Sequence, residues 1–281
     1  MSDRLAVVLQ HLLPKQALTA LAGRVAGAEA GAATTAVIRW FVRRYGVDMT
    51  EAAEPDPASY RTFNEFFTRP LKPGARPIAA AAWICPVDGA VSQFGAIAGD
   101  RLLQAKGHDY TTRALVGGDA ALAARFDGGH FATLYLSPRD YHRIHMPAAG
   151  RLVRMIHVPG SLYSVNPATV RALPGLFTRN ERVVCLFEGA GGPFVMVLVG
   201  ATIVGSMATV WHGVVNPPRP GTVREWRYDG EAVALRQGDE MGRFLLGSTV
   251  VMLWPAGPLR FNAQWAPGRS IRLGEAMADA G

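Results

Sequence analysis

Hydrophobic positions in the first 50 residues recur at spacings of three and four, which is the pattern of amphipathic helices. Three such stripes follow one another, and Pro14 lies between the first and the second. Their apolar members are Leu5, Val8, Leu9 and Leu12, then Leu18, Leu21, Ala22 and Val25, then Val37, Trp40, Phe41 and Tyr45. We therefore predict a helical N-terminal region.

From about Trp83 onward, short runs rich in β-branched residues and separated by glycine replace the helical pattern. The runs cover residues 153–158, 183–187, 194–204 and 250–254. Runs of this length and composition are typical of strands. The second half of the chain is therefore predicted to be mostly sheet.

A proline-containing connector, residues 51–60, separates the two patterns. Thr62 follows it as the predicted N-cap of a short helix that carries Phe63, Phe66 and Phe67. The predicted fold class is α+β, with a helical N-terminal region and connector over residues 1–60 and a β-rich body over residues 61–281.

Residues 193–215 contain no Lys, Arg, Asp or Glu, and this stretch is long enough to cross a bilayer. It also contains several glycines and His212, and it is rich in valine, threonine and isoleucine. We interpret residues 194–199 and 201–204 as two buried strands. A membrane span is the alternative.

The charge balance indicates an anionic partner. The chain has 29 Lys and Arg against 22 Asp and Glu, a net charge of +7. Nucleic acid, a phospholipid surface and an acidic substrate all fit that excess. The basic residues are scattered and not interleaved with aromatics, which argues against nucleic acid. The helical stripes near the N-terminus are flanked by basic residues, so they either lie on an anionic membrane or pack on the rest of the protein.

Two classes of site have little support in the sequence. The two cysteines, Cys85 and Cys185, are a hundred residues apart, so they form no disulfide framework and no metal-binding spacing. The seven histidines form no metalloprotease motif. We therefore expect no metal.

The N-terminus lacks the apolar core and cleavage site of a secretory signal peptide.

Three distant segments contain the candidate chemistry. Asp88 stands in Pro86-Val87-Asp88-Gly89, where Asp-Gly is either an ordinary turn or a functional carboxylate. His142 and His145 stand in a segment dense in polar residues. Residues three apart on a strand point to opposite faces. Ser137-Pro138 is a predicted helix start, and a turn through His142 that straightens at residues 145–147 would bring both rings to one site.

The third segment contains Gly247-Ser248-Thr249. Its spacing is not that of the nucleophile elbow of the α/β-hydrolases. A Gly-Ser bond is suited to self-cleavage, because glycine leaves its carbonyl unshielded from the next hydroxyl. A serine nucleophile needs a base, and the base needs an orienting carboxylate. Ser248, His145 and Asp88 would fill those three roles.

Taken together, these segments resemble the phosphatidylserine decarboxylases, specifically the bacterial membrane-associated type. The resemblance covers nearly the whole chain, and the ordered set is very specific. It comprises Phe66-Phe67-Thr68-Arg69-Pro70-Leu71-Lys72, Pro86-Val87-Asp88-Gly89, Lys106-Gly107-His108-Asp109-Tyr110, Asp140-Tyr141-His142-Arg143-Ile144-His145-Met146-Pro147, Ser164-Val165-Asn166-Pro167, Asn180-Glu181-Arg182 and Gly247-Ser248-Thr249.

The resemblance implies a proenzyme that makes its own cofactor. The triad Asp88, His145 and Ser248 would cut the Gly247–Ser248 bond, giving a β chain (1–247) and an α chain (248–281). Ser248 would become a covalent pyruvoyl group, which condenses with the substrate amine as a Schiff base and serves as an electron sink.

The implied reaction is decarboxylation of phosphatidylserine to phosphatidylethanolamine in phospholipid biosynthesis. His142 would assist decarboxylation or deliver the proton. Residues 1–60 would associate with an anionic membrane surface and residues 61–281 would be the β-rich catalytic domain. The expected location is peripheral, on the cytoplasmic side of a bacterial inner membrane, and the expected assembly is a dimer of αβ units.

Two other functions are alternatives to this decarboxylase. A Ser-His-Asp hydrolase without self-cleavage would keep an intact chain and attack an external ester or amide. A basic protein that binds lipid or nucleic acid would have no decarboxylase activity.

Overall fold

The computed structural model describes residue 10 and residues 14–202, 206–217, 219, 221–230, 233–245 and 249–281. The first predicted helical stripe, apart from its neighbour Gln10, lies outside the described residues. The other two stripes form α2 (Lys15–Ala26) and α3 (Ala32–Tyr45), as predicted. Gly46 ends α3 in a left-handed conformation, with its N–H donating to the Val42 carbonyl, a position where glycine is favoured.

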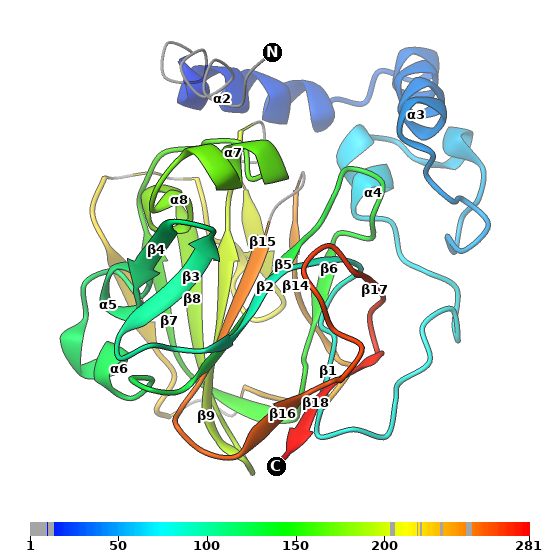
Figure 1. The fold of residues 1–281 in the computed structure, drawn as a ribbon. Helices are drawn as coiled ribbons and strands as arrows, with labels where there is room; N and C mark the ends of the chain where they lie inside the picture. Colours follow the sequence, from blue (N-terminus) through cyan, green and yellow to red (C-terminus); the bar gives the residue numbers. More distant parts are fainter. Residues whose placement is uncertain are drawn as a thin grey trace.

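The short aromatic helix is confirmed as α4 (Phe63–Phe67). Thr62 caps it, because its hydroxyl oxygen accepts a hydrogen bond from the Glu65 N–H at 3.0 Å. The remaining helical segments are short: η1 (Pro57–Ser59), α5 (Thr112–Leu115), α6 (Ala120–Ala124), α7 (Pro167–Ala172) and α8 (Leu176–Arg179). The mostly N-terminal long helices and the strand-rich body confirm the predicted α+β class (Figure 1).

One large antiparallel sheet forms the body of the protein. Its strands pair in the order β12, β7, β8, β9, β15, β5, β2 and β17, and β13 adds to β7. Their bounds are β2 (Gly89–Ala96), β5 (His130–Tyr135), β7 (Gly150–Val158), β8 (Arg182–Gly189), β9 (Gly192–Val199), β12 (Arg224–Arg227), β13 (Ala234–Leu235), β15 (Thr249–Trp254) and β17 (Ser270–Ile271).

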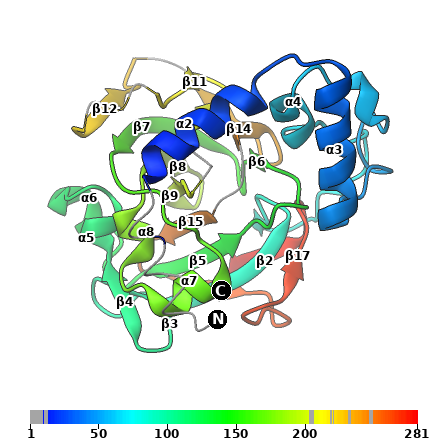
Figure 2. The ribbon, with the colours of Figure 1, turned by 90° about the horizontal axis from the view of Figure 1, so that it is seen from above.

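Three smaller sheets complete the β structure. β11 (Gly213–Val214), β10 (Met207–Thr209), β14 (Glu240–Phe244) and β6 (Arg143–His145) pair in that order. β1 (Trp83–Ile84), β18 (Ala276–Ala280) and β16 (Leu259–Phe261) form the second. β3 (Arg101–Ala105) and β4 (His108–Thr111) form the third. Figure 2 shows the large sheet curving around, with β6 and β14 facing its inner side.

The large sheet separates two hydrophobic cores. Along β15, Val251 and Leu253 belong to one core, whereas Val250, Met252 and Trp254 belong to the other, because successive side chains of a strand point to opposite faces. The first core also contains residues of the helices and of β3 and β4. The second also contains residues of the small sheets with β6, β14 and β18.

Part of the uncharged stretch at residues 193–215 forms a central strand of the large sheet. Residues 194–199 lie in β9, which confirms the first predicted strand. The second, at residues 201–204, was wrong over its described part: Ala201 forms an isolated bridge, Thr202 lies in a turn, and the next described strand is β10. Residues 203–205 lie outside the described residues. No helix in the described part of the chain is both long and apolar enough to cross a bilayer.

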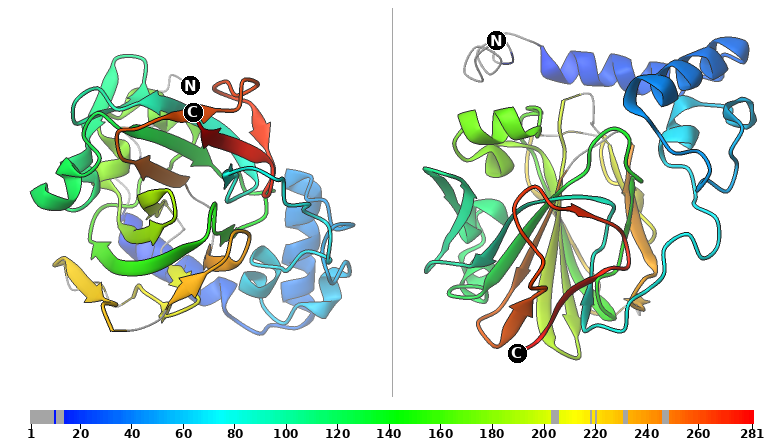
Figure 3. Two further views of the ribbon diagram at one scale, coloured as in Figure 1. Left: turned by 90° about the horizontal axis from the view of Figure 1, so that it is seen from below. Right: turned by 45° about the vertical axis from the view of Figure 1, so that its right-hand side comes forward.

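The N-terminal helices lie at one end of the strands. Figure 3 shows α2 across this end, and the C-terminus lies at the opposite end. A cavity of about 390 Å³ separates α2 from the strand ends and is lined by Thr19, Ala20, Gly23, Asn64 and Leu245, among others. The same end of the large sheet contains Thr249, the first residue of β15, whose partners are Val199 and Tyr135.

The close approach of β2 and β5 at Gly89 leaves no room for a side chain, so a substitution there tests it. A Cβ there would lie 2.2 Å from the Tyr135 carbonyl oxygen, so Gly89→Ala must push β2 away from β5. We expect it to destabilise the protein by about 2–3 kcal/mol and to lower the melting temperature by several degrees, measured by calorimetry. The control is Gly23→Ala in α2, where a Cβ meets nothing within 4 Å and alanine favours the helix. Equal melting temperatures for the two variants would contradict the close β2–β5 approach.

Candidate active site

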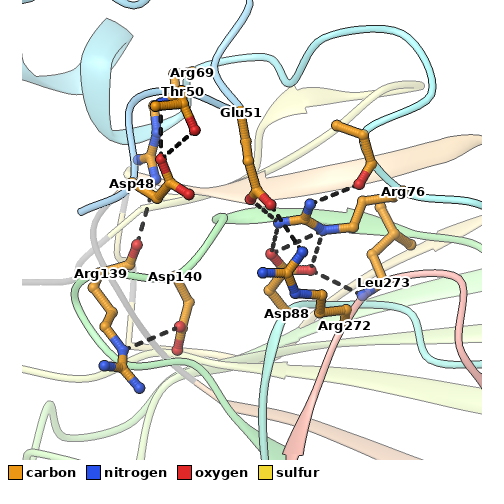
Figure 4. A network of polar contacts seen from close by, with 11 residues as sticks. Asp48, Thr50, Glu51, Arg69, Arg76, Asp88, Arg139, Asp140, Arg272 and Leu273 are labelled. Carbon is orange, nitrogen blue, oxygen red and sulfur yellow. Dashed lines mark hydrogen bonds and ion pairs between the residues drawn. The ribbon is translucent and has the colours of Figure 1, made fainter. Parts of the chain in front are cut away.

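Asp88 lies directly before β2 and is held by two groups. Both of its carboxylate oxygens accept hydrogen bonds from Arg76 Nε, at 2.9 and 3.1 Å. Oδ1 also accepts from the Leu273 N–H at 2.8 Å. Arg76 in turn forms an ion pair with Glu51 at 2.7 Å (Figure 4). Asp88 therefore connects the start of β2 with a segment near the C-terminus.

His145 is the last residue of β6, and both of its ring nitrogens have partners. Nδ1 lies 2.7 Å from the Gly238 carbonyl oxygen and Nε2 lies 3.1 Å from the Tyr141 hydroxyl. A carbonyl oxygen only accepts, so Nδ1 carries the proton and Nε2 presents its lone pair. Burial lowers the pKa of His145, although the hydrogen bond to Gly238 opposes the shift. At neutral pH the ring is therefore in the form that accepts protons.

Asp88 and His145 belong to one site without touching. The backbone N–H of His145 donates to the Pro86 carbonyl at 2.9 Å, two residues before Asp88. Tyr141, which is hydrogen-bonded to His145, lines the same cavity as Asp88. Within the described structure, however, no hydrogen bond joins the Asp88 carboxylate to the His145 ring. The carbonyl of Gly238 occupies the place where an orienting carboxylate was expected.

His142 is fully buried and stacks on Phe67, with ring centroids 4.0 Å apart and an interplanar angle of 16°. Neither ring nitrogen makes a hydrogen bond of normal length and angle among the described residues, although the backbone of Ser137 and Pro138 faces the ring and opposes the lowering of its pKa. Burial, and then the charge of Arg69, lower the pKa of His142 to about 3. The ring is therefore neutral at physiological pH.

The chain around the two histidines follows the sequence hypothesis only in part, because the hypothesis placed the turn through His142 and the straight segment at residues 145–147. A turn at residues 138–139 precedes His142, and the chain then straightens into β6. The predicted helix start at Ser137-Pro138 was wrong, because no helix follows. The carboxylate of Asp140 instead accepts hydrogen bonds from both the N–H and the hydroxyl of Ser137, which stabilises a turn.

A cavity of about 550 Å³ opens beside these residues. Asp88, Tyr141, Tyr135 and Arg69 are among the residues that line it. Arg69 is only 3% exposed, and its Nε has no partner in the described part of the chain. Its Nη2 donates to the Arg139 carbonyl at 3.4 Å. Arg76, Arg139 and Arg272 also line the cavity, as do Asp48, Glu51, Asp88 and Asp140, and Arg76 and Arg272 are ion-paired with these carboxylates.

The predicted cleavage residues, Gly247 and Ser248, lie outside the described residues. The chain on either side of them is fixed. Before them, Leu245 donates its N–H to the Ser206 carbonyl, and Phe244 donates to the His142 carbonyl. After them, Thr249 begins β15 beside Tyr135, which lines the cavity with Asp88.

Several residues of this site were missed by the sequence analysis. Arg76 and Gly238 belong to no motif that was singled out there. Tyr141, Arg69 and Phe67 stand inside quoted motifs, but no role was assigned to them. No group of three or more His, Cys, Asp or Glu residues that could hold a metal ion occurs in the described part of the chain.

Comparisons with known proteins identify the family. A family model described as phosphatidylserine decarboxylase matches residues 63–279, and a model described as PSD matches residues 5–46. Similar proteins named phosphatidylserine decarboxylase proenzyme come from Azoarcus sp. (strain BH72), 74% identical over 99% of this chain and 97% of that protein, and from Albidiferax ferrireducens, 73% identical over 99% and 98%. A third, from Delftia acidovorans, is 70% identical over 99% and 98%. The chain therefore belongs to the phosphatidylserine decarboxylase family, and the resemblance, the enzyme class and the proenzyme character predicted from its sequence are confirmed.

Proposed function

We propose that this chain decarboxylates phosphatidylserine to phosphatidylethanolamine after cutting itself at Gly247–Ser248. Family membership over nearly the full length is the observation that carries the proposal. It favours this function over that of a Ser-His-Asp hydrolase. The site supports it with a neutral base, a second neutral histidine and a cavity that Arg69 lines as a buried cation.

The proposed maturation starts with His145. As the Ser248 hydroxyl loses its proton, the His145 ring gains one at Nε2, and the serine oxygen attacks the Gly247 carbonyl carbon. The peptide C–N bond breaks, its nitrogen gains a proton, and an ester forms. Loss of the Ser248 Cα proton then expels Gly247 as a carboxylate and leaves dehydroalanine. Tautomerisation and addition of one water release ammonia and leave the pyruvoyl group.

Asp88 supports this step through its charge in our proposal. A negative charge near His145 stabilises the imidazolium that forms when the base takes a proton, and Asp88 opposes the lowering of the His145 pKa by burial. Its hydrogen bond to the Leu273 N–H also joins the two chains that cleavage would create. Asp88 would therefore have an electrostatic and a structural role.

The α chain would stay bound after cleavage. β15 pairs with β5 on one side and β9 on the other, β17 pairs with β2, and β18 pairs with β1. Arg272 forms an ion pair with Glu51 at 2.8 Å. Because these contacts run from residue 249 to the C-terminus, removal of one peptide bond leaves the fold in place. We further propose that two αβ units form a dimer.

The residues around the start of β15 suit a pyruvoyl group at position 248. Thr249 Oγ1, directly after position 248, is buried without a hydrogen-bond partner among the described residues, so a polar group is available to a carbonyl-rich group. The pyruvoyl group supplies a ketone that condenses with an amine and withdraws electrons. Arg69 adds a buried positive charge that suits an anionic substrate.

His142 would act at the carbon that loses carbon dioxide. With a pKa of about 3 it is neutral at physiological pH, so it accepts or donates a hydrogen bond there but carries no spare proton. A negative charge brought in by the substrate raises the pKa of a nearby histidine. Proton delivery by His142 would therefore depend on a bound substrate.

We propose that α2 and α3 contact the membrane. Leu18, Leu21 and Val25 lie along one side of α2 and are 37–66% exposed, and Val37 and Trp40 of α3 are 48% and 54% exposed. We call these five residues the α2–α3 apolar face. Exposed arginines accompany it at positions 24, 39, 43 and 44. Apolar side chains and basic charge both favour an anionic bilayer surface. Binding would be peripheral, on the cytoplasmic side of a bacterial inner membrane.

The two histidines should separate maturation from catalysis. His145→Ala should leave an uncut chain, because it removes the base. His142→Ala should still be cut but should decarboxylate at least about 100-fold more slowly. Denaturing gels measure cleavage, and carbon dioxide release from phosphatidylserine measures turnover. The control is His130→Ala, at the far end of β5 from Tyr135. If both site variants lost the same step, this division of roles would be wrong.

The α2–α3 apolar face should govern membrane binding. We expect the double variant Leu21→Asp/Val25→Asp to bind vesicles with anionic lipid at least about tenfold more weakly, because burial of each apolar side chain contributes about 1.5–3 kcal/mol. Vesicle flotation measures the bound fraction. Leu103→Asp is the control, since Leu103 is 45% exposed but lies on β3. Unchanged binding of the double variant would place the membrane contact elsewhere.

A further inference from the structure

Tyr141 makes a contact that the expected triad does not contain. Its hydroxyl lies 3.1 Å from His145 Nε2, the nitrogen that a serine base must use. The side chain is almost completely buried, at 5% exposure for the residue, yet it lines the cavity that also contains Asp88. The tyrosine therefore touches both the base and the cavity.

The direction of the hydrogen bond between Tyr141 and His145 follows from the partner of the other ring nitrogen, Nδ1. His145 Nδ1 must donate to the Gly238 carbonyl, which has no proton to give. Nε2 is then the acceptor, and the phenol of Tyr141 donates to it. Burial raises the pKa of Tyr141 to about 12, so the phenol keeps its proton at physiological pH.

This arrangement has a consequence for self-cleavage. The lone pair that would take the serine proton is already occupied by the phenol hydrogen. We infer that Tyr141 is the proton relay of the maturation step, passing the proton of the attacking hydroxyl to His145. The inference rests on the proposed self-cleavage at Gly247–Ser248.

The relay conserves protons. The Ser248 hydroxyl gives its proton to the Tyr141 oxygen while Tyr141 gives its own to His145 Nε2. The bond from the serine oxygen to the Gly247 carbonyl carbon forms in the same step. Tyr141 ends unchanged and His145 ends protonated. The reverse transfer then supplies a proton to the departing nitrogen of residue 248.

The charged groups around His145 set the background for a pH test. Glu240 on β14 and Asp88 before β2 raise the pKa of His145, and Arg143 on β6 lowers it. None of these groups changes in Tyr141→Phe. A donated hydrogen bond at Nε2 stabilises the neutral ring, so its loss should raise the pKa of His145. The cleavage rate, which needs the neutral ring, should then reach its half-maximum at a higher pH.

The experiment follows self-cleavage of full-length protein made by cell-free translation, at a series of pH values. We expect Tyr141→Phe to be cut about 100-fold more slowly, with its half-maximal rate about 0.5–1 pH unit higher. Tyr110→Phe is the matched control, because Tyr110 is equally buried but its hydroxyl lies near Thr133 and makes no contact with His145. It should be cut at the wild-type rate.

Each other outcome contradicts a defined part of the account. Wild-type-like cleavage of Tyr141→Phe, or slow cleavage with an unchanged pH midpoint, would overturn the relay. Absence of cleavage in the wild-type chain would instead overturn the proposed function. If Tyr141→Phe does not fold, 3-fluorotyrosine at position 141 replaces it. Its more acidic phenol donates more strongly, so the midpoint should move to lower pH, and an unchanged midpoint would again overturn the relay.

Discussion

The position of β15 in the middle of the large sheet is the constraint on which the rest of the structure depends. This strand is buried along its whole length and pairs with β5 and β9 on its two sides. Its first residue, Thr249, is therefore fixed by two neighbours directly after the proposed cleavage bond. A cut at that point frees a chain end without freeing the strand, so the new end stays next to the residues that would use it.

The same sheet end explains the electrostatic character of the site. Burial there keeps His142 and His145 neutral, whereas Arg69 remains as a buried cation. Neutral imidazoles accept protons and buried arginines attract anions, so one region combines bases with an affinity for negative charge. A reaction that removes a proton from a serine, and another that acts on an anionic lipid, both suit this environment.

The sequence predicted the elements whose pattern is long enough to repeat. The stripes of α2 and α3, the cap at Thr62 and the β-branched runs of β7, β8, β9 and β15 are all found where expected. Helices α5 to α8 are too short for a periodic signal. The partner of His145 at Gly238 is 93 residues away and is a backbone carbonyl, which every residue type provides. Arg76 is likewise brought to Asp88 only by the fold. Asp88, His142 and His145 could be selected as candidates from the sequence, but the groups that they contact could not be predicted from it.

The central claim is that this chain converts its own Ser248 into a pyruvoyl group, and the most direct measurement is the denatured intact mass of the purified protein beside its Ser248→Ala variant. The account predicts two chains for the wild type, one ending at Gly247 and one starting at residue 248 and lighter by one ammonia than a peptide that begins with serine. It predicts a single uncut mass for the variant. A single full-length mass for active wild-type protein would contradict it.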